Sequence, residues 1–230
     1  DIGIGKREAI KDISTLFSRY NDVIMARLFD HQHIVELAEY ADIPVINGLT
    51  DYNHPCQIMT DILTVWEHRG NLDNLKVCYM GDGNNIVNSW LQLATRFSMH
   101  FVCCGPEGYE PDSETVNRVN DSDLSSYELS HDPLSAVKDA DIIYTDVWAS
   151  MGQKEEAGER EKIFAPFQVN RSLIESTGKD TLFMHCLPAE RGREVTDSVM
   201  ESSNSIVFDQ AENRMHAQNA IMVYLSQIMS

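Results

Sequence analysis

A histidine and a cysteine stand side by side in the stretch FMHCLPAERG, residues 183–192, where an apolar run ends. A structural metal site needs several Cys or His ligands at suitable spacing, and no such set accompanies His185 and Cys186. A redox pair would need a resolving cysteine, and the chain has no C-x-x-C pair. Two roles remain for Cys186, a covalent nucleophile or a noncovalent binding group. The candidate bases for a nucleophile are His54, His131 and His216.

Polar residues also follow four other predicted strands. These clusters are Arg27, Asn47-Gly48, Asp82-Gly83-Asn84-Asn85 and Asp146. In open α/β sheets, ligands bind in the crevice at the carboxyl ends of the strands. The sequence therefore predicts that these side chains meet His185 and Cys186 in one binding site.

Three of the candidate residues suit an anionic ligand. Arg27 directly follows a predicted strand, where a guanidinium can grip a phosphate or carbonyl oxygen in bidentate fashion. His54 precedes a proline at a predicted helix start, and Gln57 lies three residues further on, so both can face the crevice near a helix N-terminus. An ordinary helix cap with a polar third residue explains the same pattern.

Two further candidates lie in the second half of the chain. Asp146 ends a predicted strand in TDVWASMG, where it can hold a substrate ammonium group or simply cap a turn. Arg214 lies near the start of the predicted last helix, where it is either a site residue or an ordinary polar residue of the first helical turn. The charged segment 149–162 between them is either a solvated surface segment or a lid over the site.

The stretch YMGDGNNIVNS, residues 79–89, resembles the start of a dinucleotide fingerprint. The third glycine is missing at the required spacing, and Glu107 gives only weak support for a ribose-binding acid. A tight turn with an asparagine helix cap explains Asp82 and Gly83. It explains two consecutive asparagines less well, and an amide pair suits an amino-acid head group.

Short apolar runs alternate with amphipathic stretches, which predicts parallel sheets covered on both faces. The expected strands are 22–26, 43–46, 76–80, 100–104, 141–145, 181–184 and 205–208. The expected helices are 6–20, 32–41, 54–68, 85–97, 134–140 and 211–229. A boundary at residues 68–75 divides the chain into a first unit, 1–70, a second unit, 71–210, and a C-terminal helix, 211–230, that returns to the first unit.

Composition excludes some partners. The chain has 230 residues and a net charge of −18, which argues against nucleic acid or an anionic membrane surface as a partner. No apolar run approaches the roughly 18 residues of a membrane span. Five cysteines without a paired spacing favour a reducing compartment over a disulfide framework.

The motifs HPCQ, GDGNN, DVWASMG, HCLP and ENR occur in this order, and together they resemble those of the ornithine carbamoyltransferases over essentially the whole chain. The resemblance implies two doubly wound parallel-sheet α/β domains, the first of them incomplete, in a homotrimer. It also implies transfer of a carbamoyl group from carbamoyl phosphate to the δ-amine of L-ornithine, without metal or cofactor. The compartment would be the cytoplasm in a bacterium, and the chloroplast or mitochondrial matrix in a eukaryote.

The resemblance also implies roles for individual residues. Carbamoyl phosphate would be held by Arg27, His54, Gln57, Cys186, Leu187 and Arg214, with Arg214 polarising the carbonyl oxygen. Ornithine would be held by Asn85, Asp146, Ser150 and Met151. Asp146 and Cys186 would place and deprotonate the side-chain amine, and segment 149–162 would be the lid.

Two departures from the family pattern keep alternatives open. The family has a Ser-x-Arg-Thr phosphate loop, and nothing in residues 1–230 matches it, so we expect the first third of the protein to be missing and autonomous activity to be in doubt. Asn88 stands where the family often has His, which we expect to alter only local hydrogen bonding. The alternatives are an inactive fragment, a carbamoyltransferase for putrescine or acetylornithine, and a nucleotide-binding α/β module.

Overall fold

The computed structural model describes residues 4–5, 7–149 and 157–228, and its larger part is built on a five-stranded parallel sheet. The strands are β3 Leu75–Met80, β4 Met99–Cys104, β5 Ser126–Ser130, β6 Ile142–Thr145 and β7 Leu182–His185. Their order is β5-β4-β3-β6-β7. The chain adds β4 and β5 on one side of β3, and then adds β6 and β7 on the other side. The carboxyl ends of β3 and β6 therefore mark the switch point where an open sheet forms its crevice.

Both faces of this sheet are covered. One face packs against α3, α4 and α5, and the other against α6, α8 and α9. Along β3, Val77 and Tyr79 enter the first core while Cys78 and Met80 enter the second. Because alternate residues of a strand point to opposite faces, a strand covered on both faces must be apolar throughout, as β3 is. The helices of these layers are α4 Asn85–Ala94, α5 Ser113–Asp121, α6 Pro133–Ala136, α7 Ala157–Phe164, η2 Ala165–Phe167, α8 Arg171–Glu175 and α9 Asp197–Met200.

A smaller unit precedes this sheet. It contains two parallel strands, β1 Ile24–Arg27 and β2 Val45–Leu49, and two helices, α1 Ile10–Ser18 and α2 His31–Tyr40. Its core is a small cluster formed by Ile10, Ile13, Ile34 and Leu37. Large apolar side chains such as Met25 and Phe29 remain exposed in this unit.

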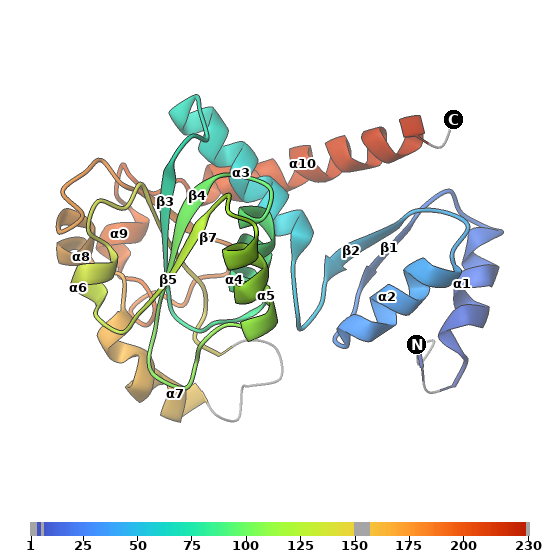
Figure 1. The fold of residues 1–230 in the computed structure, drawn as a ribbon, viewed down its shortest axis with the longest axis horizontal. Helices are drawn as coiled ribbons and strands as arrows, with labels where there is room; N and C mark the ends of the chain where they lie inside the picture. The colour runs from blue at the N-terminus through green and yellow to red at the C-terminus, as the bar shows by residue number, and fades with distance from the viewer. Residues whose placement is uncertain (1–3, 6, 150–156, 229–230) are drawn as a thin grey trace.

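Two long helices, α3 Pro55–Arg69 and α10 Val207–Ile228, pack against each other. Figure 1 shows α10 leaving the larger sheet and extending alongside α3 toward the side of the molecule that holds β1 and β2. Buried polar contacts fix their register: Gln210 donates to Asp61 over 2.6 Å, and Asn213 donates to Thr64 over 3.1 Å. The sequence predicted that the last helix returns to the first unit, and α10 does run toward the side that holds β1 and β2 (Figure 1). The predicted domain limits stay a prediction.

The predicted strand at 205–208 is wrong. Ser205 makes only an isolated bridge to Phe183, and α10 begins at Val207. The apolar run there fills the two cores on either side of the sheet, since Ile206 enters the first and Val207 the second. β5 was not predicted because its sequence, SYELS, is polar; it is an edge strand that pairs only with β4.

Within the described ranges, no helix is long and apolar enough to cross a membrane.

Candidate functional site

A cleft of about 810 Å³ lies where β1, β2, β3, β6 and β7 end. Eight predicted site residues line it: Arg27, His54, Gln57, Asn85, Asp146, Cys186, Leu187 and Arg214. Ser150 and Met151, predicted to hold ornithine, lie outside the described residues, as does half of the predicted lid, residues 150–156. The structure thus brings together side chains that are up to 187 positions apart in the sequence, from Arg27 to Arg214.

His54 stands at the start of α3 and faces two cations. Its backbone N–H donates to Ser89 over 2.7 Å, which fixes the turn into the helix. Its Nδ1 is buried and has no hydrogen-bond partner in the described part of the chain. Burial, followed by the charges of Arg214 and Arg27, lowers the pKa of His54 to about 4. The imidazole is therefore neutral near pH 7 and offers one N–H donor and one acceptor to a ligand.

Asp61 lies one helical turn beyond Gln57 and shows the opposite shift. It is fully buried, and burial raises its pKa to about 7 in spite of hydrogen bonds from Gln57 and Gln210. Sequence reasoning missed this residue, because an aspartate in the middle of an amphipathic helix usually faces solvent.

These two shifts predict opposite pH dependences of stability. Between about pH 4 and 6.5 the unfolded chain binds a proton at His54 that the folded protein does not, so this group makes folding more favourable as pH rises. Between about pH 4 and 7 the folded protein keeps a proton at Asp61 that the unfolded chain loses, so this group makes folding less favourable as pH rises. Each full proton is worth a slope of about 1.4 kcal/mol per pH unit.

We therefore expect His54→Gln to flatten the rise of unfolding free energy with pH between 4.5 and 6, and Asp61→Asn to steepen it. Urea unfolding of both variants and the wild type across this range measures the effect. Curves that run parallel for all three proteins would contradict the two shifts.

Asp146 and Cys186 form the opposite wall of the cleft. The Cys186 thiol donates to Oδ1 of Asp146 over 3.1 Å, and the amide of Asn84 donates to Oδ2 over 3.3 Å. Burial, followed by the nearby Asp146 charge, raises the pKa of Cys186 well above its ordinary value. The side chain is thus a protonated thiol near pH 7, which argues against the covalent nucleophile and for the binding group. The other two candidate bases, His131 and His216, do not line the cleft.

Asp146, His185 and Cys186 bring three potential metal-ligand atoms within 4.8 Å of one another. His185, however, is engaged on both nitrogens: Nδ1 accepts the backbone N–H of Leu187 over 2.8 Å, and Nε2 lies 3.3 Å from Glu194. A ligating nitrogen must have a free lone pair, and neither nitrogen of His185 offers one in this arrangement. The triad therefore fits a hydrogen-bonded turn better than a metal site.

The GDGNN turn follows β3 and borders the cleft. The Asn84 side chain accepts from the backbone N–H groups of Ile86 and Val87, at 3.0 and 3.4 Å, and so caps α4, which is the helix-cap alternative for this stretch. Those are the N–H groups that a nucleotide phosphate would need. A Cβ on Gly83 would overlap the backbone of Pro111, so packing alone requires a glycine at this position. The turn therefore lacks the geometry of a dinucleotide site.

Asp82 is paired with a residue that the sequence did not reveal. Arg160, almost fully buried, donates to Asp82 and to the backbone oxygen of Trp148, and its guanidinium lies over the ring of Tyr109 at 4.9 Å. It thereby fastens the start of α7 to the cleft wall. No signal distinguished it from the other charged residues of segment 149–162.

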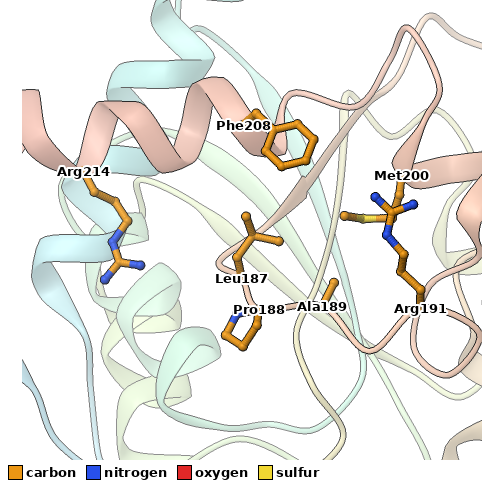
Figure 2. A pocket seen from close by; sticks show the side chains of 7 residues that line it. All are labelled: Leu187, Pro188, Ala189, Arg191, Met200, Phe208 and Arg214. Carbon is orange, nitrogen blue, oxygen red and sulfur yellow. The ribbon is translucent and has the colours of Figure 1, made fainter.

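Arg214 projects from α10 into the region between two pockets. The second pocket, of about 440 Å³, is lined by Leu187, Pro188, Ala189, Arg191, Met200, Phe208 and Arg214. Figure 2 shows the two arginines on opposite sides of the Leu187–Ala189 segment. Leu187 has a φ of 55°, a conformation that residues other than glycine rarely adopt and that concentrates at functional sites.

Comparisons with known proteins agree with this arrangement. Residues 1–67 match the carbamoyl-P binding domain, and residues 73–225 the Asp/Orn binding domain, of the aspartate/ornithine carbamoyltransferase family. The chain is 60% identical to the chloroplastic ornithine carbamoyltransferase of Pisum sativum over 98% of its own length, and 51% identical to the Pyrococcus abyssi enzyme. It spans 60% of the first relative and 72% of the second.

Solved structures show the same relationship. The ornithine carbamoyltransferase from Pyrococcus furiosus matches 96% of this chain and 72% of its own, with a TM-score of 0.88 and 51% identity. The anabolic enzyme from Campylobacter jejuni matches 99% of this chain and 76% of its own, with a TM-score of 0.91 and 30% identity.

Proposed function

Because the chain belongs to the aspartate/ornithine carbamoyltransferase family, we propose that the full-length protein transfers the carbamoyl group of carbamoyl phosphate to the δ-amine of L-ornithine. The products are L-citrulline and phosphate. One observation carries the proposal: a single cleft has the guanidinium groups of Arg27 and Arg214, the neutral imidazole of His54 and the amide of Gln57 on one wall. The Asp146–Cys186 pair lies on the other wall. An anionic donor and a cationic amine can therefore face each other across it.

The donor wall suits carbamoyl phosphate. Arg27 and Arg214 offer guanidinium groups to the phosphate and carbonyl oxygens, and neutral His54 offers an N–H. Attack of the amine nitrogen places negative charge on the carbonyl oxygen. Donors that are already in position stabilise that charge without reorganisation. The bond from carbon to the bridging oxygen then breaks, and phosphate leaves with the electron pair.

The amine wall suits ornithine. The δ-amine must lose a proton before its nitrogen can attack, and the Asp146 carboxylate, which lines the cleft beside Cys186, is the base in this proposal. Cys186 donates to that carboxylate, so the thiol orients Asp146 and does not itself take the proton. Asn85, anchored by a 3.1 Å bond from its amide to the Thr50 carbonyl, and Ser150 and Met151 would hold the amino-acid head group.

A colorimetric assay for citrulline on the full-length protein tests the proposal. We expect citrulline at saturating carbamoyl phosphate and ornithine, and little product when putrescine or N-acetylornithine replaces ornithine. No citrulline, with activity toward either other amine, would indicate a different acceptor. Tight calorimetric binding of NAD or ATP would instead favour a nucleotide-binding module, and no activity at all would favour an inactive protein.

The assembly and the location are further parts of the proposal. A homotrimer is expected, and sedimentation velocity measures it. The name of the pea relative places that protein in the chloroplast. By analogy we expect a chloroplast or mitochondrial matrix location in a eukaryotic source and the cytoplasm in a prokaryotic one.

Cys186→Ala is expected to raise the KM for ornithine and lower kcat, each by about 5- to 10-fold, because it removes one hydrogen bond to a carboxylate, and such bonds are worth about 1.5–3 kcal/mol. Steady-state kinetics with varied ornithine measures both. Cys104→Ala is the matched control, since that thiol is fully buried in the second core and does not line the cleft. Trapping of a carbamoyl-cysteine at position 186 by mass spectrometry would contradict the noncovalent role.

A further inference from the structure

One buried carboxylate joins both walls of the cleft and has no role in the steps above. Oδ1 of Asp61 accepts from Nε2 of Gln57 over 2.8 Å and from Nε2 of Gln210 over 2.6 Å. Gln210 in turn accepts the backbone N–H of His185 over 3.0 Å, at the start of the turn that carries Cys186 and Leu187. Oδ1 of Asp61 thus joins α3 to α10, and the side chain of Gln210 joins α10 to β7.

This contact determines which way the Gln57 amide points. A side-chain amide has a donor end and an acceptor end, and its hydrogen-bond partners decide between the two orientations. Because the carboxylate of Asp61 accepts from the nitrogen of Gln57, the carbonyl oxygen is the end of the amide that does not face Asp61. That oxygen, Oε1, is buried and has no hydrogen-bond partner among the residues that the structure describes, and Gln57 lines the cleft. A buried acceptor without a partner costs free energy unless a ligand supplies a donor.

We propose that Asp61 is a specificity-determining positioning residue that holds Gln57 with its carbonyl oxygen toward the donor substrate. This inference rests on the proposed function, and it adds how the cleft recognises the carbamoyl group. A carbamoyl group carries an –NH₂ that can donate to Gln57 Oε1, whereas an acetyl group of nearly the same shape carries a methyl. A site with a buried acceptor rejects the methyl analogue because the acceptor is then left without a partner.

The surroundings of Asp61 support an acceptor in this position. Arg214, on α10, adds positive charge nearby, and Tyr144, on β6, adds a hydroxyl beside the carboxylate. Cys186, after β7, also lies within range of its charge. Burial raises the pKa of Asp61 to about 7, so the ionised, acceptor-only form predominates under mildly alkaline conditions.

The test compares carbamoyl phosphate with acetyl phosphate, which differ at this one group. Calorimetric titration of the full-length protein at pH 8 gives the dissociation constant of each, without ornithine and without turnover. We expect the wild type to prefer carbamoyl phosphate, and Asp61→Leu to reduce that preference by about 10-fold or more, as loss of a specific buried hydrogen bond would. Asp61→Asn retains an acceptor oxygen and is expected to restore most of the preference.

Thr64→Val is the matched control. Thr64 lies on α3, is fully buried and accepts from Asn213 of α10, so this change disturbs the same helix pair without touching Gln57. It is expected to lower the melting temperature and leave the preference unchanged. In a Gln57→Leu background, Asp61→Leu is expected to reduce the preference no further, because the two residues act through one contact.

The outcomes separate the inference from the proposed function. A wild type that shows the preference and makes no citrulline keeps the inference and refutes the function. An unchanged preference in Asp61→Leu overturns the inference whatever the activity. If that variant does not fold, Asp61→Ala replaces it. A high-resolution structure with carbamoyl phosphate then decides independently, since a carbamoyl nitrogen that is not bonded to Gln57 Oε1 also overturns it.

Discussion

Arg214→Gln is expected to lower kcat for citrulline formation by about 10²- to 10³-fold, with the protein still folded, because removal of one preorganised oxyanion donor typically costs that much. Arg214 lines the cleft, and its charge reaches His54, Cys56 and Asp61, so it contributes to the field of the whole donor wall. Glutamine keeps a polar side chain at this position but lacks the positive charge of arginine. That charge stabilises the negative carbonyl oxygen, which forms only in the transition state. The KM for ornithine should change much less than kcat, and steady-state kinetics separates the two.

Arg191→Gln is the matched control for this experiment. Figure 2 places Arg191 and Arg214 around the same Leu187–Ala189 segment. Arg191 is directed elsewhere: it is 36% exposed and pairs with Asp197 at 3.0 Å and Glu201 at 2.6 Å. We expect Arg191→Gln to retain most of the activity. A similar loss of kcat in both variants would mean that Arg214 acts through this segment and not on the carbonyl oxygen.

The parts of the fold that sequence predicted best are those buried on both sides. β3, β4, β6 and β7 are near-continuous apolar runs. The residues that follow β3, β6 and β7 line the crevice, as the geometry of a parallel sheet predicts. The edge strand β5 was missed because half of an edge strand faces solvent and its sequence looks polar. The false strand at 205–208 arose because an apolar run that fills two cores has the same composition as a strand.

For the site, positions after predicted strands indicated Arg27, Asn85, Asp146 and Cys186, and all four line one cleft. Asn47 and His185 were also predicted to meet there, and they do not line it. The supporting residues were not predictable in the same way. Asp61 and Gln210 lie within helices whose burial depends on each other, so nothing in the sequence of either helix shows the contact. Arg160 is hidden in a charged segment, and only its pairing with Asp82 distinguishes it.

Asp146→Asn is expected to lower kcat/KM for ornithine by about 10³-fold at pH 7, within the range that general-base catalysis provides. The substitution preserves the shape of the side chain and its acceptor for the Val147 N–H, now 2.8 Å away. It removes the negative charge that attracts the substrate ammonium and the site that takes its proton. An amine of this type has a pKa of about 10.4, so only a small fraction is neutral at pH 7 without a base. The loss should therefore shrink as pH rises toward 9.5.

Asp141→Asn is the matched control, because Asp141 flanks the same strand, β6, and has a purely structural role. Asp141 immediately precedes β6 and Asp146 follows it, so the two carboxylates lie at opposite ends. Asp141 pairs with Arg69 at 3.0 Å and Lys179 at 3.1 Å, far from the cleft lining, and its replacement should lower the melting temperature without changing the KM for ornithine. Asp146→Asn should lower kcat/KM for ornithine and leave the melting temperature unchanged. If its activity loss were independent of pH, Asp146 would be holding the substrate without taking the proton, and the base would have to be the solvent.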